Sequence, residues 1–329
     1  METRPSCRPL RAFASAFTRR AMPCVVLCAG LALVPACGST RDDAPIDTVS
    51  FDELDDERKD LVLAYLEGGE RWERAFDRAR ADERLSDFLV INLSQNLVRH
   101  FEAGDFLRGG APDSRYERAR SALARLGPSS AAFLARMVNE GPDDIVREAG
   151  ADALAAMGPD GVRPALDLVA SDDAPTRRRA CAIAGRLTGV DAEQERALSD
   201  ALTTVARADA AWIVRAEAVR ACGRRVFVHT DAPGGMLASP YAAALGDALT
   251  DPDPAVVGRA ADAVAAADLA PAVPELVRAL RRTDGDIGAF DRIQRALARL
   301  LREPGARDAD AWWGLWLERR ATLLGIERG

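Results

Sequence analysis

Side chains that carry chemistry are scarce in this sequence. Its 329 residues include two histidines, a single lysine and 5% aromatic residues. Neither histidine is followed by glutamate, and no group of histidines and cysteines has the spacing of a zinc site, so the ligand sets of common metal centres are missing. Glycine-rich phosphate loops and the Gly-x-Ser-x-Gly turn of serine hydrolases are also absent. The sequence therefore predicts no catalysis and no bound cofactor.

The balance of charge is acidic. The formal net charge is −7, and the basic residues are almost all arginine. Five of these arginines lie within the first 20 residues, so the remainder of the chain is more acidic still. Binding to nucleic acid depends on lysine and arginine side chains that neutralise phosphates. An acidic chain of this kind argues against nucleic acid as a partner.

The amino-terminal segment has the composition of an export signal. Its arginines precede an apolar run, Cys24–Ala36, of 13 residues. This run is too short to cross the ~30 Å core of a bilayer as a helix. It predicts a cleaved secretory signal over residues 1–36 rather than a membrane span.

The end of this signal resembles the lipobox of bacterial lipoproteins. Val34-Pro35-Ala36 precedes Cys37, which in that motif is acylated and becomes the first mature residue. Residues 37–49 have no apolar period and predict a flexible tether. We therefore expect lipidation at Cys37 and a position on the extracytoplasmic, periplasmic side of the inner or outer membrane. Ordinary cleavage that leaves a free Cys37 thiol is the alternative.

Three glycines, Gly127, Gly158 and Gly189, recur 31 residues apart. Glycine can end a helix in the left-handed conformation, and a proline follows the first two. A stripe at helical spacing precedes the middle glycine: Ala149, Ala153, Leu154 and Met157. Leu166 and Val169 supply a second apolar stripe after it, and an acidic turn follows. The pattern predicts a helical hairpin whose neighbours are copies of itself, since one hairpin cannot bury both faces.

Loose copies of this hairpin extend over residues 113–303. Residues 50–112 predict three helices that do not repeat the motif, the first starting from a capping-box pattern at Ser50–Glu53. Residues 304–329 predict a tryptophan-rich helix. Both flanking segments are interpreted as caps that cover the ends of the repeat core.

The repeated segment resembles HEAT repeats. The resemblance rests on a Val-Arg-x-x-Ala-x-x-Ala-Leu first helix, a glycine stop, a leucine-rich second helix and an aspartate-rich turn. The period near 31 is similar to that of the short repeats found in phycobilisome lyases and many bacterial proteins. The resemblance implies an all-α, right-handed α–α superhelix with helical caps at both ends, used as a scaffold.

Charged residues recur with the repeats. Arginines stand in the first helices, at Arg147, Arg178, Arg215 and Arg259, and aspartates fill the turns between hairpins. Alternation of this kind predicts a ladder of ion pairs between successive repeats. Two cysteines on first helices, Cys181 and Cys222, favour buried thiols, with a disulfide between them as the alternative.

Two segments are candidate binding sites. An insertion between residues 224 and 240 separates the helices of the fourth hairpin, and insertions in a solenoid often lie on its binding face. His229, Asp231 and Met236 are its candidate contacts, and tolerated drift of a surface loop is the alternative. Trp312 and Trp316 share one helical face and could bind a partner, but burial as part of the cap is favoured.

These patterns predict a non-enzymatic, membrane-anchored scaffold that binds an envelope protein or peptide. The alternative is a small-molecule or chromophore binder of the lyase type, which would use the concave face and the His229 loop. A tetrapyrrole would need a large aromatic cavity, and few aromatic residues are present to build one.

Overall fold

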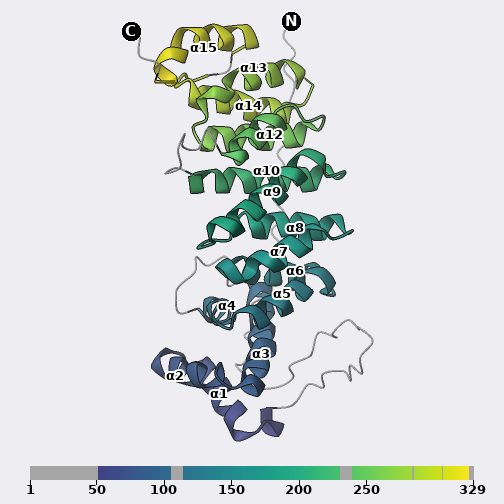
Figure 1. Cartoon of the computed structure of the whole chain (residues 1–329), viewed down its shortest axis with the longest axis vertical. Coiled ribbons are helices and arrows are strands. Elements are labelled where there is room, and N and C mark those ends of the chain that lie inside the picture. The colour runs from purple at the N-terminus through teal and green to yellow at the C-terminus, as the bar shows by residue number, and fades with distance from the viewer. Residues whose placement is uncertain (1–50, 105–113, 230–238, 284, 306, 326–329) are drawn as a thin grey trace, which may run out of the picture.

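The computed structural model describes residues 51–104, 114–229, 239–283, 285–305 and 307–325. Within these ranges the chain forms fifteen α-helices and four short 3-10 helices, and none of these residues belongs to a β-strand. Figure 1 shows the helices stacked in chain order along one long axis. The all-α helical repeat superhelix predicted from the sequence is confirmed.

An amino-terminal unit of three helices precedes the repeats. It comprises η1 (Phe51–Glu53), α1 (Asp56–Glu67), α2 (Gly69–Ala79) and α3 (Glu83–Glu102). The sequence predicts that the capping-box pattern at Ser50–Glu53 starts the first helix. This prediction is wrong, because α1 begins at Asp56. The side chain of Asp55 instead accepts a hydrogen bond from the Arg58 amide at 2.9 Å. Acidic residues in the first turn then complement the helix dipole, so this later position makes the better cap.

Six helical hairpins follow in the described part of the chain. Their first and second helices are α4 (Arg115–Arg125) and α5 (Pro128–Glu140), α6 (Asp144–Ala155) and α7 (Val162–Val169), α8 (Ala174–Ala184) and α9 (Ala192–Ala208), α10 (Trp212–Arg225) and α11 (Pro240–Ala248), α12 (Pro254–Ala266) and α13 (Val273–Arg282), and α14 (Ile287–Leu300) and α15 (Ala309–Leu323). Short 3-10 turns lie inside three hairpins: η3 (Gly158–Gly161), η4 (Val226–His229) and η6 (Ala270–Ala272). The tryptophan-rich helix α15 packs on α13 and occupies the second-helix position of the sixth hairpin.

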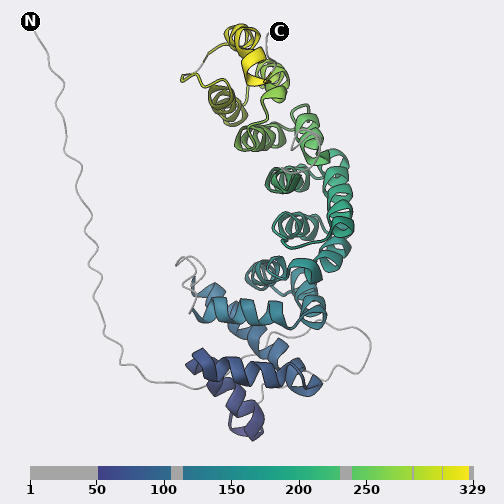
Figure 2. The ribbon, with the colours of Figure 1, turned by 60° about the vertical axis from the view of Figure 1, so that its left-hand side comes forward.

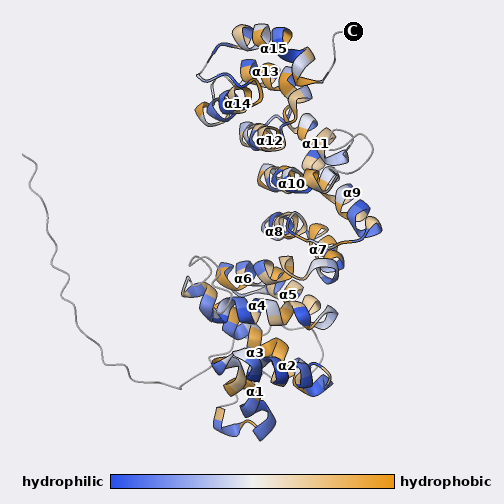
Figure 3. Ribbon diagram, turned by 90° about the vertical axis from the view of Figure 1, so that its left-hand side faces the viewer, coloured by the Kyte–Doolittle hydropathy of each residue, from blue (hydrophilic) through white to orange (hydrophobic). Residues whose placement is uncertain are grey.

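The first helices form the inner row of a curved stack. Figure 2 shows the arc, and Figure 3 shows α8, α10, α12 and α14 in one row with α7, α9 and α11 in the other. Small residues bring the inner helices together. A Cβ atom added at Gly185 would lie 2.7 Å from that of Ala221, and one at Gly223 would lie 2.6 Å from that of Ala263. Because first helices pack on each other more extensively than second helices do, the stack curves toward the first helices.

Two ion pairs of the same geometry link a first helix to the turn that precedes the next hairpin, and we call each of them a lock. Nε and Nη2 of Arg177 on α8 hold the carboxylate of Asp209 at 2.7 and 3.1 Å, and Arg215 on α10 holds Asp251 at 2.7 and 2.9 Å. The remaining Nη1 of each arginine donates to carbonyl oxygens of the turn before its own helix. Burial would raise the pKa of Asp209, yet hydrogen bonds from Arg177 and the Ala211 amide, with the charge of both arginines, hold it below its usual value.

The predicted ladder of ion pairs between repeats is present, since pairs such as Arg207–Asp247 and Arg292–Asp262 also join neighbouring hairpins. Its members differ from the predicted arginines. The two locks use the fourth residue of a first helix, which is an arginine at four positions: Arg118, Arg147, Arg177 and Arg215. Arg118 instead donates to the carbonyl oxygen of Tyr65 in α1. Arg147 has no such partner because Ser171 occupies the corresponding position of the next turn. Arg178 lies one residue out of register and pairs backwards with Glu148 at 2.9 Å. Arg259 is also out of register and forms no ion pair with any described residue.

The core of the second hairpin follows one predicted stripe and departs from the other. The predicted residues of α6 and its end are all buried: Ala149, Ala153, Leu154 and Met157. In α7 the buried residues are Val162, Ala165 and Leu168, whereas Leu166 and Val169 are partly exposed at the edge of the core. The 3-10 turn η3 precedes α7 and changes the rotation per residue, so the buried face shifts by one position.

The recurring glycines adopt the conformation that the sequence predicts. The φ angle is 74° at Gly127, 59° at Gly158 and 68° at Gly189, in the left-handed region that glycine enters readily. Asp268 and Arg302 take the same position in the fifth and sixth hairpins, with φ angles of 53° and 52°. A residue in the left-handed conformation thus follows the first helix of most hairpins, and Asp268 and Arg302 adopt this conformation where no glycine is present.

Replacing Gly158 by alanine is expected to destabilise the protein by about 2 kcal/mol or more, because a left-handed non-glycine residue costs ~1–2 kcal/mol. The added Cβ would also lie 2.9 Å from the carbonyl oxygen of Thr188. Gly189→Ala is the matched control, since its Cβ would meet no atom within 4 Å. Urea unfolding followed by circular dichroism measures both variants. Equal losses would contradict the role assigned to the Thr188 contact.

Candidate functional site

The residues singled out in the insertion are described only at its start. The main chain of His229 ends η4, directly after α10. Asp231 and Met236 lie outside the described residues, as does Cys37 near the amino terminus. The candidate surface is therefore sought on the described helices.

The two tryptophans of the last helix lie inside the protein. Trp312 is 0% exposed and Trp316 is 5% exposed. The indole Nε1 of Trp312 donates to Oε1 of Gln294 at 2.7 Å, which ties α15 to α14. Both side chains close the end of the core and are removed from the candidate binding surface. Trp313, on another face of α15, is 38% exposed.

A buried polar cluster anchors both ends of the insertion. The guanidinium of Arg225, the last residue of α10, forms an ion pair with Glu195 of α9 and donates to the Tyr241 hydroxyl of α11 at 3.2 Å. That hydroxyl donates to Glu195 at 2.7 Å, and Nη1 of Arg225 donates to the carbonyls of Ala184 and Leu187 at 3.0 and 2.8 Å. Burial, and then the hydrogen bond and charge of Glu195, raise the pKa of Tyr241. Four helices of the third and fourth hairpins, α8 to α11, are joined at this cluster.

Sequence reasoning missed this cluster because each member has an ordinary local explanation. Arg225 is one of two adjacent arginines, Glu195 stands in an acidic first turn, and Tyr241 follows a helix-starting proline. One signal was available: the chain has three tyrosines, and a tyrosine buried in a helical core needs a hydrogen-bond partner. The identity of that partner depends on contacts between distant segments.

Within the ranges that the structure describes, no set of histidine, cysteine, aspartate and glutamate side chains is placed to hold a metal ion. The same ranges include no helix with the length and apolar character needed to cross a bilayer. Cys181 of α8 and Cys222 of α10 are buried free thiols. Burial raises the pKa of Cys222 to about 12 and also raises that of Cys181. Both thiols stay protonated at neutral pH and serve as packing residues.

A groove of about 420 Å³ crosses the concave face at the first turns of α10, α12 and α14. Trp212 and Ile213 line it from the start of α10 and are 47% and 43% exposed. Ile287, at the start of α14 beside the lining residue Gly288, is 79% exposed. Trp212 and Ile213 form the apolar part of this groove, which we call the inner groove, and Ile287 lies beside it.

The polar part of the inner groove offers mainly hydrogen-bond donors. The carboxylate of Glu217 is held by Arg220 of the same helix, with Nε at 2.9 Å. The carboxylate of Asp286 accepts from the Ala289 amide at 2.7 Å. Arg259 projects from α12 with no ion-pair partner in the described chain and is exposed. One oxygen of each carboxylate is thus already hydrogen-bonded, whereas the Arg259 guanidinium has no ion-pair partner in the described chain.

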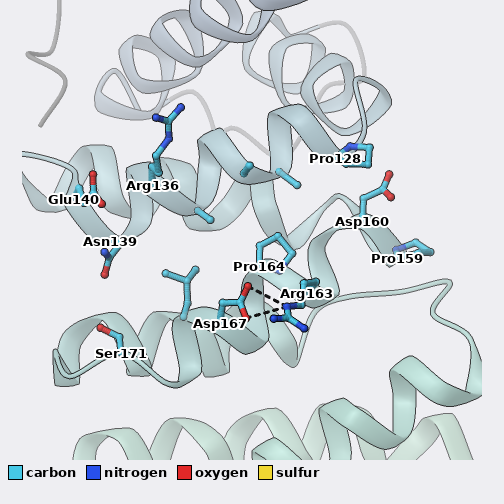
Figure 4. Close-up of a pocket in the computed structure, with 14 residues that line it drawn as sticks. Pro128, Arg136, Asn139, Glu140, Pro159, Asp160, Arg163, Pro164, Asp167 and Ser171 are labelled. Carbon is cyan, nitrogen blue, oxygen red and sulfur yellow. Dashed lines mark hydrogen bonds and ion pairs between the residues drawn. The ribbon is translucent and has the colours of Figure 1, made fainter. Parts of the chain in front are cut away.

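A larger cavity, of about 710 Å³, lies between α5 and α7 in the outer row. Figure 4 shows Arg163 and Asp167 of α7 side by side at its edge, and their Nε and Oδ1 atoms are 3.0 Å apart. Ala131, Ala135 and Leu168 supply apolar lining. None of its lining residues is aromatic, so it provides no stacking surface for a flat chromophore. We therefore take the inner groove as the candidate site.

Comparisons with known proteins concern the fold. No protein-family model matches the chain, and no curated protein matches it. Among solved structures, an engineered protein of the Northeast Structural Genomics Consortium is 20% identical with a TM-score of 0.40, covering 75% of this chain and 97% of that one. The designed armadillo repeat protein YIII(Dq)4CqI is 16% identical with a TM-score of 0.34, covering 63% and 99%. Kap121p bound to Nup53p is 13% identical with a TM-score of 0.43, covering 84% and 31%.

Replacing Glu195 by glutamine is expected to lower the free energy of unfolding by about 3–5 kcal/mol, because the buried Arg225 would lose its carboxylate partner. Asp247→Asn is the matched control. Asp247 pairs with Arg207 at 2.8 Å, but both side chains are exposed, so its loss should cost ~0–1 kcal/mol. Urea unfolding measures both variants. A loss in Glu195→Gln as small as that of the control would show that the buried cluster does not join the hairpins.

Proposed function

We propose that this protein is a non-enzymatic scaffold that binds a protein or peptide partner on the concave face of its repeats. The observation that carries this proposal is the inner groove, where Trp212 and Ile213 stay exposed and Ile287 lies beside them. Exposed apolar surface is unfavourable in water by roughly 25 cal/mol per Å². A groove that keeps two large apolar side chains exposed, with a third beside it, is a surface that we expect a partner to cover. An aromatic anchor within a groove is also the common centre of a protein–protein contact.

The layout of the inner groove favours an extended segment over a compact ligand. Its lining residues come from four successive first helices, beginning with Arg178 of α8 and ending with Arg292 of α14. Neighbouring first helices present equivalent positions one repeat apart, so a chain that crosses the stack meets the same kind of position repeatedly. A peptide, or an exposed segment of a folded protein, fits that arrangement.

We further propose that the protein is exported and held at the extracytoplasmic side of the membrane by a lipid on Cys37. Support comes from the signal-like residues 1–36 and from the lipobox resemblance at their end. A tether of residues 37–49 would reach at most about 45 Å when fully extended. On this proposal the partner is another protein of the cell envelope.

Photo-crosslinking tests the binding proposal. A photoreactive amino acid is placed at position 213 in the inner groove and, in a second variant, at position 196 on the outer helix α9. Irradiation in cells of the source organism should give one dominant adduct from position 213. Trp212→Ala should lower the yield of that adduct about tenfold or more, since hot-spot tryptophans contribute on the order of 2 kcal/mol to binding.

Trp313→Ala is the matched control for this experiment. Trp313 is 38% exposed on α15 and is not among the residues that line the inner groove, so its loss should leave the adduct unchanged. Adducts of equal yield from positions 213 and 196 would contradict the proposal. An adduct at position 213 that survives Trp212→Ala at full yield would contradict it as well.

Fractionation tests the anchoring proposal separately. The wild-type protein should sediment with membranes, and Cys37→Ser should move it to the soluble or unprocessed precursor fraction, because no acyl chain can be attached. Mass spectrometry of the wild-type protein should detect acylation of the amino-terminal peptide. An unmodified Cys37 in a protein that still sediments with membranes would rule out this anchor.

A further inference from the structure

We infer that the segment bound in the inner groove is acidic, with at least one apolar side chain among its carboxylates. This inference rests on the proposed function, because it specifies the chemistry of the partner at the same surface. The apolar side chain would pack on Trp212 and Ile213, and the carboxylates would contact arginines of the inner row.

The inner row is strongly basic although the chain as a whole is acidic. The first helices α8, α10, α12 and α14 together contain eleven arginines and three carboxylates. The net charge of the chain is −7, so the acidic excess lies elsewhere. Seven of the eleven arginines pair with carboxylates of the described chain, so the positive charge that the inner row leaves unpaired is carried by the other four.

Several inner-row arginines are not used by the fold. Four exposed guanidinium groups have no carboxylate partner among the described residues: Arg224, Arg259, Arg295 and Arg299. Two arginines that line the inner groove, Arg178 and Arg292, are each held through a single Nη atom, at 2.9 and 2.6 Å from their partners. Their other N–H groups remain free to donate. The concave face therefore carries positively charged hydrogen-bond donors that have no acceptor in the described chain.

The free arginines continue the surface of the inner groove along the helices. On α10, Arg220 and Arg224 follow the lining residue Glu217 at intervals of three and four residues, which keeps them on one helical face. On α14, Arg295 and Arg299 follow Arg292 at the same intervals. The apolar side chains at the helix starts are thus followed along the helices by a row of arginines, which we call the basic stripe.

Positive charges on this stripe also crowd one another. Partial burial, and then the nearby charges of Arg220 and Arg186, lower the pKa of Arg224. An approaching carboxylate would relieve this repulsion and form charge-assisted hydrogen bonds to the planar guanidinium groups. A basic segment would meet the same repulsion and be rejected.

Fluorescence anisotropy with two labelled peptides tests the inference on the purified protein. In the first peptide glutamate alternates with leucine, and in the second lysine replaces every glutamate. The acidic peptide should bind, the basic peptide should not, and added salt should weaken the binding. The double variant Arg224→Glu/Arg259→Glu should weaken binding of the acidic peptide about tenfold or more, since charge reversal replaces attraction by repulsion.

The matched control is Arg196→Glu/Arg320→Glu, which reverses two exposed arginines of second helices that have no ion-pair partner in the described chain. This variant should bind the acidic peptide as the wild type does, and both variants should keep the circular dichroism of the wild type. Equal binding of the two peptides, or an unchanged affinity in Arg224→Glu/Arg259→Glu, would overturn the inference.

The crosslinked partner separates this inference from the proposed function. Mass spectrometry of the adduct from position 213 should identify a contact peptide rich in aspartate and glutamate. A contact peptide without acidic residues, captured equally by Arg224→Glu/Arg259→Glu, would overturn the acidic assignment and leave the scaffold function standing. The absence of a position-specific adduct would instead remove the proposed function itself.

Discussion

The close approach of the first helices is the constraint on which the rest of this structure depends. A single hairpin leaves an apolar face uncovered, so each one must pack on the next. Gly185 against Ala221 and Gly223 against Ala263 allow the inner helices to meet almost backbone to backbone. The outer helices contact one another less extensively, and the stack curves as a result. Curvature in turn brings the first turns of α10, α12 and α14 together and creates the inner groove.

Polar contacts then fix how successive hairpins sit on one another. The Arg177–Asp209 and Arg215–Asp251 locks and the Arg225 cluster all lie in the third to fifth hairpins, and the last of them holds the end of α10 that is far from the groove. Apolar packing between helices is tolerant of small sliding motions, whereas paired arginines define a direction and a distance. These contacts therefore hold the groove-forming helices in a preorganised arrangement, which reduces the ordering that binding would require.

The same organisation explains the basic concave face. Most first helices begin with an aspartate whose side chain accepts from an amide of the first turn, as at Asp143, Asp173, Asp253 and Asp286. Other aspartates are taken up by the locks. Acidic residues thus gather in the turns, where they cap and join helices, and the arginines remain along the helical faces. An acidic protein acquires a basic inner surface without any cluster that stands out in its sequence.

The repeat, the glycine-ended first helices and the buried stripe of α6 can all be predicted from the sequence. These features depend on residues three or four apart and on the backbone freedom of glycine, which are local properties. Only the tertiary structure decided that Arg177 and not Arg178 forms the lock, that Arg225 meets Glu195, and that Trp212 is exposed whereas Trp312 is buried. Each of these outcomes depends on which distant helix lies opposite the side chain. Adjacent arginines, or tryptophans at the starts of two helices, look alike in sequence until packing gives one a partner and leaves the other facing solvent.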